Sequence, residues 1–198
     1  METDETRAPS IGSSTTPVRA RLAGAALLLL VLFVLSGAWL LGSRTIHDQF
    51  PISPPALPRV GSPAPDFSLN DTQTGKAVTL SSLRGRPVWI NFWATWCDAC
   101  KLEMPQMQRV YSQYKAQGLA ILGIDVQESA GAVNAYTRSG GFDWTFLLDP
   151  NGAVIDRYFV EGVPTHVFVG ADGIIKAIHA GAITETEMAE SLGKIMGQ

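Results

Sequence analysis

The sequence is poor in the cysteine and histidine residues that hold structural zinc, with two cysteines and three histidines among its 198 residues. A structural zinc site needs four ligands, usually cysteine or histidine, and no pair of the histidines (His47, His166 and His179) has zinc-ligand spacing. Basic residues are not in excess, with 15 Lys and Arg against 18 Asp and Glu. Nucleic-acid binders show a basic patch, so this class of protein is not indicated. The sequence has no internal repeat, and its length suggests one domain with short additions.

Charge is absent from Leu22 to Gly42, a stretch of 21 residues. About 20 apolar residues in a helix cross a hydrocarbon core of roughly 30 Å, so this stretch predicts a transmembrane helix. A cleaved signal peptide is the alternative, but its apolar region has only about 7–15 residues. Here the small residues Ser36, Gly37 and Ala38 are followed by further apolar chain, which favours an uncleaved signal anchor.

The basic residues on either side of this stretch predict its orientation. Arg7, Arg19 and Arg21 precede it, and Arg44 and Arg59 follow it closely. Cytoplasmic flanks carry the larger number of basic residues, so the excess of one favours a cytoplasmic N-terminus. The chain is then a single-pass protein of the cell membrane, and its remainder is expected on the periplasmic or cell-surface side.

Composition divides the chain into four parts. Residues 1–21 are rich in Ser, Thr, Pro and charge, which predicts a disordered cytoplasmic tail. Residues 22–42 form the predicted signal anchor, and residues 43–58 contain four prolines, which is typical of a semi-extended linker. Residues 59–198 are long enough to form one compact core.

Strand and helix patterns alternate along residues 59–198. Alternation of this kind predicts parallel pairing, and a closing hairpin around 171–173 predicts an antiparallel edge. We therefore expect an α/β domain with a mixed central β-sheet flanked by helices. The expected strands are 66–69, 77–80, 88–92, 119–126, 144–148, 165–170 and 174–180, and the expected helices are 97–117, 131–139 and 184–196, the last opening with a capping box.

The only two cysteines, Cys97 and Cys100, stand where a buried strand ends and a helix begins. Helix N-termini stabilise thiolates, and two cysteines three positions apart on a first helical turn can close a disulfide. One sulfur can then attack a substrate disulfide and the other can resolve the mixed disulfide. A purely structural disulfide is the alternative, but so short a loop gains little stability from cross-linking.

The residues around these cysteines resemble the active-site region of the thioredoxin superfamily. Residues 91–105 read NFWATWCDACKLEMP, and matching motifs elsewhere are GSPAPDF (61–67), LRGRP (83–87), GVPT (162–165) and DG (172–173). The resemblance covers residues 59–198 and is closest to the extracytoplasmic TlpA/ResA-like branch, which includes the thioredoxins of cytochrome c maturation. It implies a thioredoxin-like fold and a thiol–disulfide oxidoreductase that needs no cofactor beyond its redox-active disulfide.

The resemblance also implies roles for individual residues. Cys97 would be the exposed nucleophile and Cys100 the buried resolving thiol. Pro164 would be a cis-proline that exposes the backbone of Val163 for pairing with an extended substrate strand, although local sequence alone would favour an ordinary trans proline. Trp96 is expected to contact substrate because it flanks Cys97, whereas the other tryptophans of the domain are expected to pack in or around the core.

Charged and polar residues near the motif carry further expectations. Glu103 stands where the cytochrome-maturation branch has a proton-handling carboxylate, and it shares a helix face with Cys100, but it could also be a solvated surface residue. Asn91 replaces the acid of cytoplasmic thioredoxins. The negative charge of Asp98 disfavours a thiolate at Cys97. This destabilises the reduced form of the protein and so favours a reducing function. His166 replaces a common threonine and either tunes the sulfurs or pairs with a local partner.

The leading functional hypothesis is a reductant of disulfides in exported client proteins, such as the haem-binding motif of apocytochrome c. A membrane electron donor of the thiol-transfer type would reduce it again. The first alternative is a disulfide oxidase or isomerase in protein folding, and the second is a membrane-tethered binding module with incidental cysteines. A peroxidase is less favoured, because Thr95 before Cys97 does not supply a peroxide-activating pattern.

Overall fold

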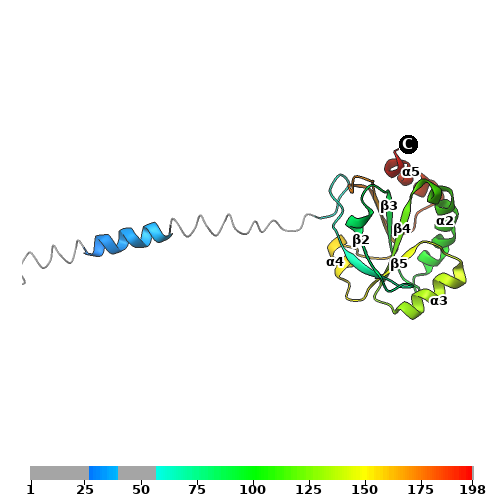
Figure 1. Ribbon diagram of the computed structural model, residues 1–198, viewed down its shortest axis with the longest axis horizontal. Helices are drawn as coiled ribbons and strands as arrows, with labels where there is room; N and C mark the ends of the chain where they lie inside the picture. Colours follow the sequence, from blue (N-terminus) through cyan, green and yellow to red (C-terminus); the bar gives the residue numbers. More distant parts are fainter. Residues whose placement is uncertain (1–26, 40–56, 198) are drawn as a thin grey trace, which may run out of the picture. The chain divides into compact units, whose positions relative to one another are not determined.

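The computed structural model of the protein describes residues 27–39 and 57–197. Contacts divide the chain into two units, Met1–Pro54 and Pro55–Gln198 (Figure 1). The predicted cytoplasmic tail and residues 43–56 of the predicted linker lie outside the described residues. Residues 27–39 are helical, and their Leu, Val, Phe and Trp side chains are exposed. Within the described residues, no helix combines the length and the apolar character needed to cross a membrane.

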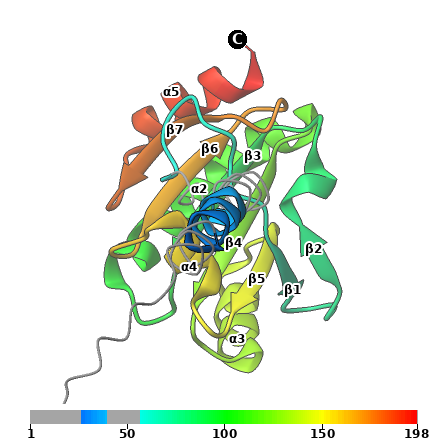
Figure 2. The ribbon, with the colours of Figure 1, turned by 90° about the vertical axis from the view of Figure 1, so that its left-hand side faces the viewer.

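Residues 57–197 form a seven-stranded sheet in the order β2-β1-β5-β4-β3-β6-β7, which Figure 2 shows side by side across the domain. The strands β3, β4 and β5 run parallel, and every other pairing is antiparallel. The predicted mixed sheet with an antiparallel edge is therefore confirmed. The strands are β1 (Ser68–Asp71), β2 (Ala77–Thr79), β3 (Val88–Trp93), β4 (Ala120–Val126), β5 (Thr145–Asp149), β6 (Thr165–Val169) and β7 (Ile175–Ala180), and the helices after residue 57 are α2 (Asp98–Tyr114), α3 (Ala130–Gly140), α4 (Ala153–Tyr158) and α5 (Glu185–Met196).

The central strand β3 is buried along its whole length and faces two cores. Successive strand side chains point to opposite faces, so Trp89 and Trp93 enter one core while Ile90 and Phe92 enter the other. The first core is closed by α2, α3 and α5, and the second is closed by α4 on the opposite face. Figure 1 shows α4 on one side of the sheet with α2 and α3 on the other.

The helix that carries the cysteines has the predicted limits. It begins with Cys97 as its N-cap residue, and a 3₁₀ turn, Lys115–Gln117, continues α2 as far as Gly118. Gly118 has a φ of 94°, in the left-handed region that glycine adopts without strain, which explains why the helix stops there. The predicted capping box of α5 is also confirmed, because Thr184 and Glu187 bond each other's backbone N–H groups.

Two local predictions need correction. The first strand begins two residues later than expected, because the Asp66 carboxylate accepts hydrogen bonds from the N–H groups of Phe67 and Ser81, which fixes this segment outside the strand ladder. Residues 149–152 are followed by the helix α4, which was not predicted. Asp149 caps its first turn, with Oδ2 accepting from the N–H groups of Val154 and Ile155 at 3.0 and 2.9 Å.

Candidate active site

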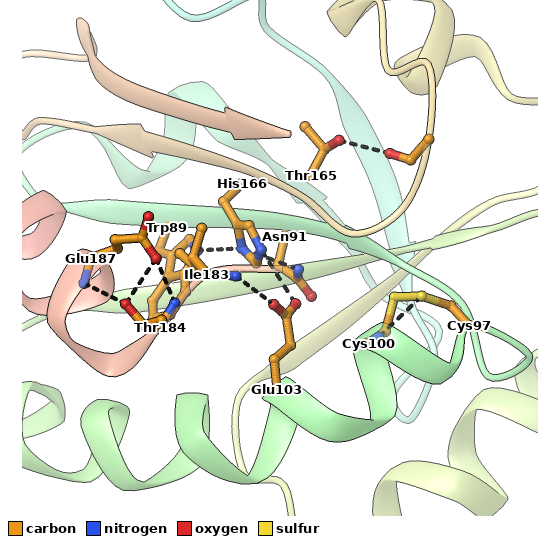
Figure 3. A network of polar contacts seen from close by, with 11 residues as sticks. Trp89, Asn91, Cys97, Cys100, Glu103, Thr165, His166, Ile183, Thr184 and Glu187 are labelled. Atoms are coloured by element: carbon orange, nitrogen blue, oxygen red, sulfur yellow. Dashed lines mark hydrogen bonds and ion pairs between the residues drawn. A yellow bond between two sulfur atoms is a disulfide. The ribbon is translucent and has the colours of Figure 1, made fainter. Parts of the chain in front are cut away.

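The two cysteines form a disulfide at the N-terminus of α2, just beyond the end of β3 (Figure 3). Their Cα atoms are 5.2 Å apart. The Sγ of Cys97 accepts a hydrogen bond from the N–H of Cys100 at 3.1 Å. Cys97 keeps only 5% of its surface exposed, so the expectation of an exposed nucleophile needs correction, but it is the more accessible of the two because Cys100 is fully buried. Because the free N–H groups and dipole of a helix N-terminus favour a thiolate, this geometry suits Cys97 to nucleophilic attack and Cys100 to resolution.

Two large apolar side chains near the disulfide face solvent. Trp96 is 62% exposed, whereas Trp89, Trp93 and Trp144 are buried. The structure thus confirms core packing for those three tryptophans and leaves Trp96 available for contact with another molecule. Leu102, two residues after Cys100 on α2, is 76% exposed.

The carboxylate of Asp98 does not act on Cys97 alone. Its Oδ1 lies 3.0 Å from the Nζ of Lys101, and its side chain is 91% exposed. Solvent and the neighbouring ammonium group both screen the field of an exposed carboxylate. The contribution of Asp98 to reducing chemistry is therefore smaller than the sequence alone suggests.

The peptide bond between Val163 and Pro164 is cis, as predicted. Strand β6 pairs antiparallel with β3, and Thr165 lies opposite Phe92, which brings the residues before β6 beside the loop after β3. The Thr165 hydroxyl donates to the carbonyl of Gly162 at 2.7 Å and braces this turn. Val163 and Pro164 line a groove of about 450 Å³, most of whose exposed lining is apolar.

Glu103 is buried, with only 2% of its surface exposed. It lies one turn after Cys100 on α2, and its Oε2 accepts a hydrogen bond from the N–H of Ile183 at 3.3 Å. Its Oε1 lies 3.3 Å from the Nε2 of His166. The alternative of a solvated helix glutamate is therefore wrong, and the proton-handling role of Glu103 stays a prediction.

His166 is fully buried and contacts residues of β3 as well as Glu103 (Figure 3). The Nε1 of Trp89 donates to its Nδ1 at 3.2 Å, and the Nδ2 of Asn91 lies 3.3 Å from the same atom. Asn91 and His166 are register partners in the pairing of β3 with β6. His166 therefore has local partners, and one of them is the carboxylate of the candidate site.

Two acids that the sequence pattern did not single out lie behind the cysteine loop. Glu128 accepts hydrogen bonds from both the N–H and the hydroxyl of Thr95, two residues before Cys97. The N–H of Glu128 in turn donates to the Oδ1 of the fully buried Asp125 at 2.9 Å. Since β3 and β4 are parallel, the residues that follow them meet at one edge of the sheet, and this pattern could have pointed to the contact.

The two acids differ in the direction of their pKa shifts. Burial, together with the neighbouring Glu128, raises the pKa of Asp125 to about 8. Burial also acts to raise the pKa of Glu128, but hydrogen bonds from Thr95 outweigh it and hold that pKa below its ordinary value. At neutral pH the charged member of the pair is therefore Glu128, which anchors the cysteine loop.

Asp125→Asn is expected to flatten the pH dependence of stability. The wild type holds the Asp125 proton up to a pKa of about 8, whereas the unfolded chain releases it near 3.8. The stability that the raised pKa of Asp125 contributes is complete below about pH 3.8. It declines as the pH rises from 3.8 to about 8, by at most about 1.4 kcal/mol per pH unit. Denaturant unfolding should give similar stabilities at pH 4 and a more stable variant at pH 8; a difference that is constant with pH would contradict the assignment.

The described residues contain no group of three or more His, Cys, Asp or Glu side chains arranged to hold a metal ion. The polar groups around the cysteines instead contact one another and the backbone. The chemistry that this arrangement can perform is thiol–disulfide exchange, with a buried carboxylate one helical turn after the buried Cys100.

Comparison with known proteins agrees with this chemistry. Residues 60–178 match the model of the AhpC/TSA family. The thiol-disulfide oxidoreductase ResA of Bacillus subtilis is 38% identical over 135 residues, which cover 68% of this chain and 75% of the relative. ResA of Oceanobacillus iheyensis is 39% identical over 145 residues, which cover 71% of this chain and 74% of that protein.

Solved structures show the same fold. The crystal structure of a thiol:disulfide interchange protein DsbE from Chlorobium tepidum matches with a TM-score of 0.66 and 27% identity, covering 71% of this chain and 99% of that one. Together, these similarities and the Cys97–Cys100 disulfide show that the chain has a thioredoxin-like fold and belongs to the AhpC/TSA family, as a thiol–disulfide oxidoreductase related to ResA.

Proposed function

We propose that the protein is a membrane-anchored, extracytoplasmic reductant of disulfides in exported client proteins, such as the haem-binding motif of apocytochrome c. The observation that carries the proposal is the buried Glu103, one helical turn after the buried Cys100. A carboxylate in this place can take a proton from Cys100 as that thiol attacks. The ResA relatives support thiol–disulfide chemistry. The client and the extracytoplasmic location go beyond what those relatives support and belong to the proposal.

The proposed cycle is a two-electron exchange in two steps. The thiolate of reduced Cys97 attacks one client sulfur, so that a mixed disulfide forms and the other client sulfur leaves as a thiolate. Cys100 then gives its proton to Glu103 and attacks the Sγ of Cys97. The bond from Cys97 to the client breaks, the client leaves as a reduced dithiol, and the Cys97–Cys100 disulfide forms. A membrane electron donor of the thiol-transfer type returns two electrons and two protons to the pair.

The client is proposed to bind across the turn at Val163 and the surface of Trp96. The turn lies beside the cysteine loop because Thr165 pairs with Phe92, and the groove of about 450 Å³ at Val163 and Pro164 can receive an extended segment. Trp96 offers an exposed aromatic side chain next to the nucleophile. The peroxidase alternative is weakened further, because the hydroxyl of Thr95 already donates to Glu128.

The proposed location depends on the N-terminal part of the chain. The uncharged stretch 22–42 and the basic residues before it support a signal anchor with a cytoplasmic N-terminus. The active-site domain then lies in a compartment where disulfides form. Carbonate washing of membranes tests the anchor, since release of the full chain would exclude a membrane-spanning segment.

Measurement of the reduction potential tests the direction of electron flow. The full-length protein is equilibrated with defined glutathione or dithiothreitol buffers, and the Cys97 and Cys100 thiols are counted by alkylation. We expect a value near that of thioredoxin, about −270 mV. A value near that of a strong periplasmic oxidant, about −120 mV, would reject the reductant and favour a disulfide oxidase.

A further inference from the structure

The buried imidazole of His166 has a tautomer that its neighbours determine. An indole N–H can only donate, and the Nε1 of Trp89 lies 3.2 Å from Nδ1 of His166. Nδ1 must therefore accept, and in the neutral ring the proton lies on Nε2. This assignment follows from donor chemistry, and the amide nitrogen of Asn91, 3.3 Å from the same Nδ1, is consistent with it.

The Nε2–H group faces the carboxylate of Glu103. The two atoms, Nε2 of His166 and Oε1 of Glu103, are 3.3 Å apart. Both atoms are buried, and neither has a hydrogen-bond partner within the described chain, because the geometry of their own 3.3 Å contact is not that of a hydrogen bond. Leaving a buried polar atom unpaired is unfavourable, so each is the available partner of the other. The second oxygen, Oε2, accepts from the N–H of Ile183, so a small reorientation of the His166 ring or of the carboxylate would give Glu103 a donor on each side.

His166 is not suited to carry the proton away from Glu103. A relay through imidazole must release a proton from the second nitrogen, but Nδ1 of His166 faces the N–H of Trp89. A different route is open, because Glu103 lines a groove of about 270 Å³ together with Leu102, Gln106 and Ala182. Glu103 can exchange its proton with solvent through this groove while His166 keeps it in place.

We propose that His166 is a positioning residue, which presents its Nε2–H to Glu103 in a tautomer fixed by Trp89 and so holds the carboxylate ready for the Cys100 proton. The inference rests on the proposed function, in which Glu103 accepts that proton. His166 touches neither client nor sulfur in this role and acts through Glu103 alone. It should therefore affect the resolving step and leave the attack of Cys97 on the client unchanged.

Single-turnover reduction of a synthetic peptide with an oxidised Cys-x-x-Cys-His motif tests the inference. Acid quenching and mass spectrometry separate formation of the mixed disulfide, by Cys97, from its resolution, by Cys100. His166→Phe is expected to slow resolution about tenfold or more, because a carboxylate that is no longer held in place meets the Cys100 thiol in the wrong geometry, and misplacement by about 1 Å can cost up to about 10²-fold. His166→Gln, which retains an N–H donor, is expected to restore most of the rate.

The matched control is His179→Phe, which removes the register partner of His166 on β7. The Nε2 of His179 contacts the Ser191 hydroxyl at 2.9 Å and not Glu103, so resolution should keep its wild-type rate. Equal slowing of attack and resolution in His166→Phe, with no rescue by His166→Gln, would show a merely structural role and overturn the proposal.

Nitrogen NMR of the His166 ring in the full-length protein gives a readout that needs no client. The expected spectrum has a protonated Nε2 coupled to its hydrogen and an unprotonated Nδ1. Protonation at Nδ1 would overturn the proposal even if the peptide is reduced. If the wild type fails to reduce any peptide disulfide, the proposed function is wrong. The NMR result still decides whether Trp89 fixes the tautomer of the His166 ring.

Discussion

Replacement of Cys100 by serine is expected to leave the protein covalently attached to its client through Cys97. Cys97 lies at the tip of α2 with 5% of its surface exposed, whereas Cys100 is fully buried. The variant can still attack a client disulfide, but serine cannot resolve the product, because thiol–disulfide exchange needs an attacking sulfur. Turnover should fall to the uncatalysed rate while a one-to-one mixed disulfide accumulates, measured as a reducible mass increase equal to the client.

Cys97→Ser provides the matched control for this trap. It retains the buried thiol of Cys100, which an incoming disulfide cannot reach, so it should form no adduct and have no activity. An adduct formed through Cys100 and absent through Cys97 would reverse the assigned roles. Both variants should remain folded, since a disulfide across two intervening residues adds little stability.

The double variant Cys97→Ser/Cys100→Ser separates an enzyme from the tethered binding module. If the protein is only a binding module, and the surface around Trp96 and Pro164 binds clients without thiol–disulfide exchange, the double variant should bind and act on its client as well as the wild type does. In the proposed enzyme, client binding survives but reduction does not. This comparison uses the same surface in both proteins, so a loss of turnover can be attributed to the sulfurs.

The parts of the site that lie close together in sequence could be predicted, and those assembled by the sheet could not. The cysteines follow a buried strand and open a helix, which is a local pattern. The contact of Thr95 with Glu128 joins residues 33 positions apart, and it exists because β3 and β4 are parallel and end at the same edge. Sequence predicts the two strands but does not by itself show which acid follows at that edge.

The environment of His166 shows the same limit. Its strand was predicted, but the sequence did not determine which face of the sheet its ring would occupy. The register of β3 with β6 sets His166 opposite Asn91, on the face that α2 covers. Only that placement brings Glu103 and Trp89 to opposite nitrogens of one imidazole. The helix α4 was missed for a related reason, since its first turn depends on the carboxylate of Asp149.

Glu103→Gln is expected to slow the resolving step strongly while Cys97 still attacks the client. Glutamine has nearly the same shape and can still accept from the N–H of Ile183, as Oε2 does now. It cannot take a proton from Cys100, and a positioned general base contributes about 10²-fold or more. The rate of mixed-disulfide resolution should therefore fall by at least about that factor, as measured by quenched single turnovers.

The control for this prediction is Glu185→Gln, which removes a carboxylate that is exposed and pairs with Arg109. If the negative charge of the domain governed the reaction, the two variants would behave alike. If Glu103 instead served only to fill its buried position, Glu103→Gln would resolve the mixed disulfide at the wild-type rate. A selective loss at the second step is the result that assigns proton transfer to Glu103, because only that step requires Cys100 to lose its proton.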